Sequence, residues 1–281
     1  MTAAPKLAGF AGALAIVLGG GALAGGLTNA NAPRSSANEE MAQMASKPDD
    51  HGAMTMSVRG LGVAENGLRL VVSTPDFTRG RTDQLRFRVV DGRGKTVRDF
   101  DVEHTKRMHL IVVRRDLTGF QHLHPVQGSD GEWTTPLRLD EAGSYRVFAD
   151  FSHDGEATTL ASNLRVDGPA TLQDLPAPAS QADSDGGYAV RLDETRAHAG
   201  EESALRFTIL RDGKPVSVQP YLGAKGHLVA LREGDLAFLH VHPTKGVQFE
   251  STFPTTGRYR LFLQFKHEGR VHTAAFTQEV I

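Results

Sequence analysis

The chain has 281 residues, of which 40% are hydrophobic and 7% aromatic, and its formal net charge is −2. This length suits about two domains, and the near-neutral charge argues against nucleic-acid binding, which usually requires a basic face. The sequence contains no cysteine, which excludes disulfides and thiolate chemistry and leaves His, Met, Asp and Glu as candidate metal ligands.

The N-terminal segment is uncharged from Leu7 to Leu27. As a helix it would be roughly 31 Å long at about 1.5 Å per residue, which matches the core of a bilayer. Lys6 favours an orientation with the N-terminus inside the cell. We therefore expect residues 1–27 to anchor a single-pass protein of the cell membrane, with the rest of the chain extracytoplasmic. The alternative is a cleaved signal peptide and a secreted protein, because small residues flank Leu23 and Asn31 in the pattern of a cleavage site.

Residues 28–56 are expected to form a flexible stalk. The stalk contains a group of possible soft ligands, namely Met41, Met44, His51, Met54 and Met56. Thioether and imidazole groups suit Cu(I) in a chain without cysteine. A disordered stalk that contains several methionines is common, however, and it is the interpretation that we favour.

The remainder of the chain is an internal repeat. The stretch "RMHLIVVRRDLTGFQHLHP" matches "KGHLVALREGDLAFLHVHP", and "EAGSYRVFADFSHDG" matches "TTGRYRLFLQFKHEG" further on. The repeat predicts two copies of one module, at residues 57–168 and 185–281. Residues 169–184, rich in Pro, Ala, Ser and Asp, are expected to be the linker between them.

Each module is expected to consist of β-strands. The apolar runs are short and are separated by turns such as Asp91-Gly92 and Asp154-Gly155, and no segment keeps a helical period for long. Tyr145 and Tyr259 each follow a glycine corner and lead into an apolar strand, which is the tyrosine-corner pattern of Greek-key sandwiches. We therefore predict an all-β fold, with two tandem immunoglobulin-like β-sandwiches behind an N-terminal transmembrane helix.

The motif Phe-x-His-x-His-Pro occurs once in each module, at 120–125 and 238–243. A hairpin between the strand that begins at His109 and the strand of the motif would bring the motif back to the level of His109. The strand that begins at Tyr145 would end near the same level if it pairs antiparallel with the first. We expect the histidines of each module to converge on one end of its sandwich. The predicted ligands are His109, His122, His124 and His153 in the first module, and His227, His240, His242, His267 and His272 in the second.

Several neutral imidazoles at one point are typical of a site for a divalent metal ion. Copper is the first choice and zinc the second, because nitrogen donors hold Cu(II) more tightly than other first-row ions. One alternative is that the histidines form a purely structural cluster, which duplication would copy as readily as a metal site. Another is an enzyme, because a metal ion with an open coordination position can activate water. The sequence contains no nucleophile elbow, phosphate loop or His-Glu-x-x-His helix, so we do not expect an enzyme.

The chain resembles a family of membrane-anchored actinobacterial proteins with tandem immunoglobulin-like modules, which are related to the YtkA-like domains and associated with copper and heavy-metal handling. The resemblance rests on "MHLIVV", "FQHLHP" and "AGSYRVFADFSHDG" and on their second copies, and it covers most of residues 57–281. It implies a sandwich fold and a role linked to metal, without supplying ligands.

The function that we expect is therefore that of an extracytoplasmic copper or zinc binding protein. Such a protein would buffer the metal ion or deliver it to a membrane metal transporter. The alternative is an immunoglobulin-like module that binds an envelope or membrane partner without metal.

Overall fold

The computed structural model describes residues 58–194, 196–239 and 241–281, which belong to one compact unit. The anchor expected at residues 1–27 and the stalk expected at 28–56 lie outside the described residues. Within the described part of the chain, no helix is long and apolar enough to cross a bilayer. The elements of this part are all β-strands.

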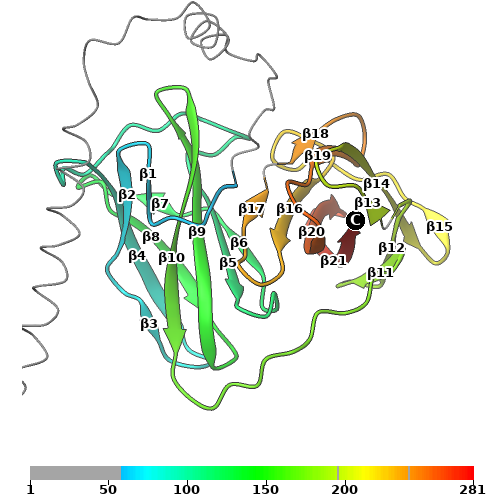
Figure 1. Cartoon of the computed structure of the whole chain (residues 1–281), viewed down its shortest axis with the longest axis horizontal. Coiled ribbons are helices and arrows are strands. Elements are labelled where there is room, and N and C mark those ends of the chain that lie inside the picture. Colours follow the sequence, from blue (N-terminus) through cyan, green and yellow to red (C-terminus); the bar gives the residue numbers. More distant parts are fainter. Residues whose placement is uncertain (1–57, 195, 240) are drawn as a thin grey trace, which may run out of the picture. The chain divides into compact units, whose positions relative to one another are not determined.

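The first module is a sandwich of two sheets (Figure 1), with strand orders β1-β2-β4-β8-β7 and β3-β10-β9-β5-β6. Its strands are β1 (Ala64–Glu65), β2 (Leu68–Val72), β3 (Asp76–Phe77), β4 (Thr82–Asp91), β5 (His109–Arg114), β6 (Gln121–Leu123), β7 (Val126–Gln127), β8 (Trp133–Arg138), β9 (Gly143–His153) and β10 (Glu156–Val166). The short β3 pairs with β10 in parallel, and the long β9 pairs antiparallel with both β10 and β5. This is the first of the two predicted immunoglobulin-like sandwiches.

The second module repeats this arrangement. Its strands are β11 (Gln181–Ser184), β12 (Tyr188–Leu192), β13 (Arg196–Ala197), β14 (Glu202–Arg211), β15 (Lys214–Pro215), β16 (His227–Arg232), β17 (Phe238–Leu239), β18 (His242–Pro243), β19 (Gln248–Thr252), β20 (Gly257–His267) and β21 (Arg270–Val280). One layer contains β12, β14, β19 and β18 and the other β17, β16, β20 and β21, and β11 pairs with a strand of each. The predicted pair of sandwiches is confirmed.

The strand β11 lies within residues 169–184, which the sequence assigned to the linker. Its four residues are polar or small and none is fully buried. The strand is held by backbone pairing to β12 and, at Ser184, to β21, so it carries no apolar pattern that would reveal it in the sequence. The second module therefore begins before the predicted boundary at residue 185.

Alternation along the strands gives each sandwich its own apolar core. Leu110 and Val112 of β5 point into the first core, and Leu228 of β16 points into the second. The hydroxyl of Tyr145 donates to the carbonyl oxygen of Glu141 (2.8 Å).

The hydroxyl of Tyr259 donates in the same way to the carbonyl oxygen of Thr255 (3.0 Å). Each donor reaches back four residues along the chain to the corner that precedes its strand. Both tyrosine corners are therefore confirmed.

A third apolar cluster joins the outer faces of the two modules. Ile111 and Val113 alternate with the core residues of β5 and therefore point away from the first core. They pack in one cluster with Val229 and Leu231, which are their equivalents in the repeat. All but one of the apolar residues of this junction form equivalent pairs: Ile111 and Val229, Val113 and Leu231, Leu117 and Leu236, Phe120 and Phe238, Phe148 and Phe262, and Ala161 and Ala275. The exception is Leu175, which has no equivalent in the cluster.

In the aromatic contacts of this junction, each ring meets a ring from the other equivalent pair, and not its own equivalent. The ring of Phe120 stacks on that of Phe262, with centroids 4.1 Å apart. Their equivalents Phe238 and Phe148 also meet, at 5.6 Å. The two modules thus meet through the same surface of each, as two subunits do in a two-fold dimer.

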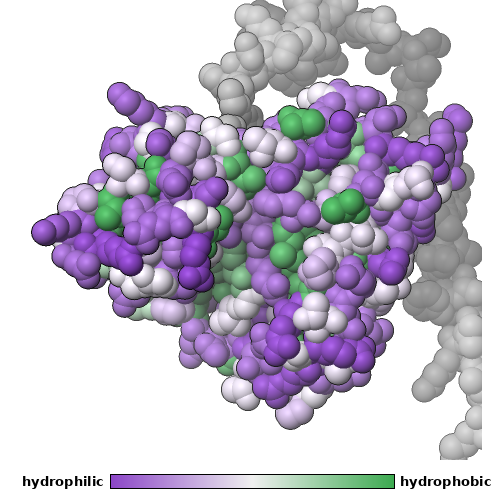
Figure 2. All heavy atoms as spheres, turned by 180° about the vertical axis from the view of Figure 1, so that it is seen from behind, coloured by the Kyte–Doolittle hydropathy of each residue, from purple (hydrophilic) through white to green (hydrophobic). Residues whose placement is uncertain are grey.

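The face of the molecule in Figure 2 is largely hydrophilic, with its apolar side chains in small patches.

Candidate metal centre

Two histidines of the first module face each other at the edge of this junction. The antiparallel hairpin of β5 and β6 pairs Ile111 with His122, so His122 lies on the same outer face as His109, two positions before Ile111. Nδ1 of His109 and Nε2 of His122 are 3.0 Å apart. The predicted hairpin therefore does bring the motif back to His109.

The outward hydrogen bonds of these two rings fix their tautomers. Nε2 of His109 lies 3.1 Å from the carbonyl oxygen of Glu103, and Nδ1 of His122 lies 2.7 Å from Oε1 of Gln264 in the second module. Because an amide oxygen only accepts, both of these nitrogens carry the proton. In a neutral ring the other nitrogen then has a free lone pair. The two lone pairs point at each other across 3.0 Å. A cation bound between the two nitrogens would relieve the repulsion between these lone pairs.

Burial keeps the rings in the neutral form that binds metal. It lowers the pKa of His122 to about 3 and that of His124 to about 4. Burial also lowers the pKa of His109 and, further, that of His227. The neighbouring imidazoles add to each of these shifts, because one protonated ring disfavours the protonation of the next.

A third nitrogen comes from the second module. The ring nitrogens of His109, His122 and His227 all lie within 4.8 Å of one another. The ring of His227 stacks on that of His109 at 5.6 Å and lies 4.7 Å from that of His122. Ligands of one ion at about 2.0–2.1 Å are roughly 2.9–4.2 Å apart. The three nitrogens therefore lie near the spacing of ligands around one ion. We refer to these three residues as the metal centre, the candidate site for the proposal below.

Two further imidazoles border the metal centre and complete what we call the histidine cluster. The ring of His124 lies 5.1 Å from that of His109, and its Nε2 is buried without a hydrogen-bond partner among the described residues. Such a group costs about 1–3 kcal/mol when it stays unpaired. The ring of His104 lies 6.1 Å from that of His109 and 5.9 Å from that of His227. The sequence did not single out His104, because it lies in a loop outside the repeated motif.

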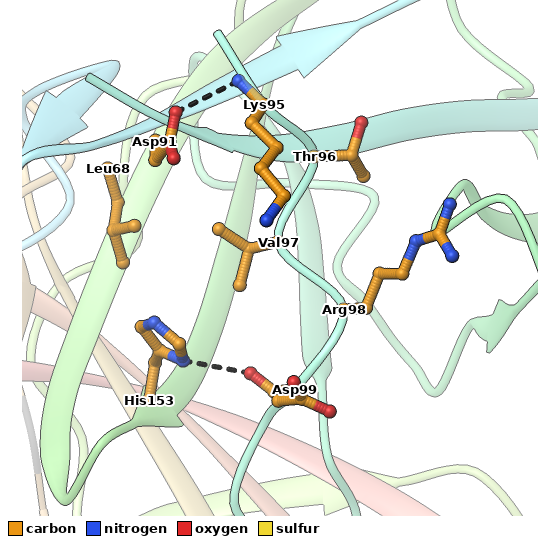
Figure 3. A pocket seen from close by; sticks show the side chains of 8 residues that line it. All are labelled: Leu68, Asp91, Lys95, Thr96, Val97, Arg98, Asp99 and His153. Carbon is orange, nitrogen blue, oxygen red and sulfur yellow. Dashed lines mark hydrogen bonds between the residues drawn. The ribbon is translucent and has the colours of Figure 1, made fainter. Parts of the chain in front are cut away.

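His153 does not lie in the cluster, contrary to the sequence prediction. The residue of β9 that pairs with His109 is Asp150, and His153 lies three residues further along, on the inner face with Phe151. Its Nδ1 donates to the carbonyl oxygen of Asp99 (2.8 Å). It lines an open pocket of about 620 Å³ together with Leu68, Asp91, Lys95, Thr96, Val97, Arg98 and Asp99 (Figure 3).

His267 and His272 form a separate group in the second module, so the prediction that they lie with His227 is also wrong. Nδ1 of His267 lies 2.7 Å from the hydroxyl oxygen of Tyr188, and the ring of His272 lies 4.6 Å from the ring of the same tyrosine. As for His153, strand alternation places His267 on the inner face of its sheet.

The two remaining predicted ligands are not described. His240 and the side chain of His242 lie outside the described residues. Among the described residues, histidines of both modules meet at their junction, whereas the sequence predicted a separate group of histidines at one end of each sandwich.

The chain matches twice, over residues 63–168 and 181–281, a family described as a domain of unknown function (DUF8832). No curated protein matches this chain.

Solved structures with similarity include the Escherichia coli adhesin FdeC (15% identity, TM-score 0.28, 78% of this chain and 65% of that one), a Salmonella alpha-2-macroglobulin reacted with methylamine (13%, 0.29, 80% and 15%), and invasin, a bacterial integrin-binding protein (10%, 0.25, 78% and 41%). The chain spans less than two thirds of the length of each. These likenesses are too weak to carry any argument about function.

Proposed function

The chain belongs to the DUF8832 family, and since that description assigns no function, we propose one from the histidine cluster: the protein binds a divalent metal ion. Copper is the first candidate and zinc the second. In this proposal residues 1–27 hold the protein at the cell membrane. The two modules lie outside the cytoplasm, where they buffer the ion or pass it to a membrane metal transporter.

One observation carries the proposal. The lone pairs of His109 and His122 face each other at 3.0 Å, and each ring is held in this tautomer by a hydrogen bond from its other nitrogen to an amide oxygen. Support of this kind, from a carbonyl or carboxylate oxygen behind the ring, is usual for histidines that ligate metal. A purely structural pair would instead place a proton between the two rings.

Each residue has a separate task in this proposal. His109, His122 and His227 supply nitrogen donors, while the carbonyl of Glu103 and the side chain of Gln264 orient two of the rings. Burial keeps the donors unprotonated and restricts the access of water. Imidazole donors suit both copper and zinc, and Cu(II) forms the stronger complexes with them.

The test is a titration of the chelator-stripped full-length protein with Cu(II) and Zn(II), followed by calorimetry. We expect one equivalent of the ion to bind to the wild-type protein. His122→Ala should weaken binding by at least about 100-fold, because it removes one ligand and also the ring that faces the second ligand, His109. The matched control is His153→Ala, which removes a histidine of the same module that lies outside the cluster and should leave binding unchanged.

Wild-type protein that binds neither ion at micromolar concentration would contradict the proposal. Equal losses in the two variants would also contradict it, since they would indicate a general effect on the fold. An immunoglobulin-like module that binds an envelope partner without metal would then be the better reading.

A further inference from the structure

A strained turn of the first module lies beside the histidine cluster. Glu103 and Lys106 pair through two backbone hydrogen bonds of 2.8 and 2.9 Å. The two residues between them, His104 and Thr105, have φ values of +47° and +69°. Left-handed conformations at both central positions are those of a type I′ turn, which favours Gly, Asn and Asp. A β-branched residue such as Thr105 is strained there, and strain of this kind concentrates at functional sites.

The turn is attached to the metal centre. Its Glu103 carbonyl oxygen accepts the hydrogen bond from Nε2 of His109 (3.1 Å). Glu103 and Thr105 are exposed, whereas His104 between them is half-buried, with its ring against those of His109 and His227. His104 therefore extends from a surface turn to the rings of both modules.

The second module contains the same turn without the imidazole. Tyr221 and Ala224 form the pair, and Leu222 and Gly223 between them have φ values of +53° and +83°. Leu222 occupies the position of His104, at the same offset of 118 that relates His109 to His227 (222 − 104 and 227 − 109). The shape of the turn therefore does not require a histidine, and the chain contains its own comparison for what His104 adds.

We propose that His104 is a fourth nitrogen ligand of the ion held by the metal centre, and that the ion enters and leaves beneath the Glu103–Lys106 turn. The inference rests on the function proposed above. A ligand on an exposed turn can move away from the centre without disturbing either sheet, whereas His109, His122 and His227 are fixed by strands or by the junction. His104 thus controls the rate of exchange as well as the affinity.

The experiment compares wild-type protein with His104→Asn, both loaded with Cu(II). Asn tolerates a left-handed backbone, so the turn is kept while the imidazole is removed. Affinity is measured by competition with a chelator, release by the rate of transfer to that chelator, and ligation by the nitrogen couplings in the electron paramagnetic resonance spectrum. We expect at least about tenfold weaker binding, faster release, and the loss of one nitrogen from the spectrum.

The matched control is Leu222→Asn, the same substitution at the equivalent position of the second module, which should change none of the three measurements. A His104→Asn protein with wild-type affinity, release rate and spectrum would overturn the inference and leave the proposed function standing. Failure of the wild-type protein to take up Cu(II) at all would refute the proposed function itself. The two failures are therefore distinguishable.

Discussion

At the scale of single residues, the protonation of the imidazoles decides what the cluster can do. The carbonyl of Glu103 and the amide of Gln264 direct one nitrogen of His109 and one of His122 toward each other. The low pKa of His122 keeps its ring neutral well below pH 7. Both rings therefore keep an unprotonated nitrogen at neutral pH, and their burial makes the folded protein less stable in acid.

The stability of the metal-free protein should fall on acidification. Unfolded histidine takes up a proton near pH 6.5, whereas folded His122 does so only near pH 3. The unfolded state thus binds more protons than the folded state from just above pH 6.5 down to about pH 3. The free energy of unfolding therefore decreases as the pH falls through this range, and it is insensitive to this group above about pH 7.5. Denaturant unfolding in the presence of a chelator should show a loss of roughly 2 kcal/mol from His122 between pH 6.5 and 4.5.

His122→Leu serves as the comparison for this measurement, because it removes the titrating group and keeps an apolar side chain in its place. Its loss of stability over the same pH range should be smaller. Parallel slopes for the two proteins would show that His122 does not contribute to the acid sensitivity.

Part of the site could be predicted from the sequence. The repeated motif and the hairpin turn correctly placed His122 and His124 beside His109. The alternation of strand side chains also indicates that His153 and His267 do not belong to this site. They lie an even number of positions from Phe151 and Phe265, and therefore on the inner face of their sheets. His104 carried no signal, because nothing in the sequence of a loop shows which strands it will meet.

At the scale of elements, the strands β5 and β16 are buried on both faces. Their sequences, His109–Arg114 and His227–Arg232, are almost continuous apolar runs, and in β5 all six residues are buried. A run without alternation is typical of a strand covered on both sides. The sequence therefore contained the information that the outer face is covered, although not which surface covers it.

The apolar junction should couple the unfolding of the two modules. Phe262→Ala removes a ring that is 3% exposed and stacks on Phe120. We expect a loss of about 3–5 kcal/mol and a separation of the thermal transition into two steps, measured by differential scanning calorimetry. Metal affinity should fall as well, because the junction holds His227 against His109.

Leu172→Ala provides the control for this substitution, since Leu172 is 57% exposed and lies outside the three apolar clusters. It should leave both the transition and the affinity unchanged. A Phe262→Ala protein that is less stable and yet unfolds in one step would mean that other contacts couple the modules.

At the scale of the whole molecule, a bound ion should act as a cross-link between the modules. Binding to the folded state alone stabilises it by about 2.7 kcal/mol when the free ion is at 100 times its dissociation constant. Addition of Cu(II) should therefore raise the Tm of the wild-type protein. His227→Ala removes the one imidazole that, among the described residues, the second module contributes to the metal centre, and it should abolish most of this rise.

The reference for this measurement is His198→Ala, in which a histidine of the second module outside the histidine cluster is changed. Its Tm should respond to Cu(II) as the wild-type protein does. A full increase in Tm with His227→Ala would place the ion within the first module alone.

The meeting of the two modules through equivalent surfaces has a consequence for how such a site can arise. In a dimer of identical subunits, every substitution appears twice, so a new side chain on one side of the axis is always accompanied by its copy on the other. Tandem duplication within one chain removes this constraint. Gln264 supports His122 while the equivalent position holds Asp150, and His104 belongs to the histidine cluster while its counterpart is Leu222. A fused pair can thus evolve a single asymmetric centre, and it assembles that centre at any dilution, because its two halves cannot separate.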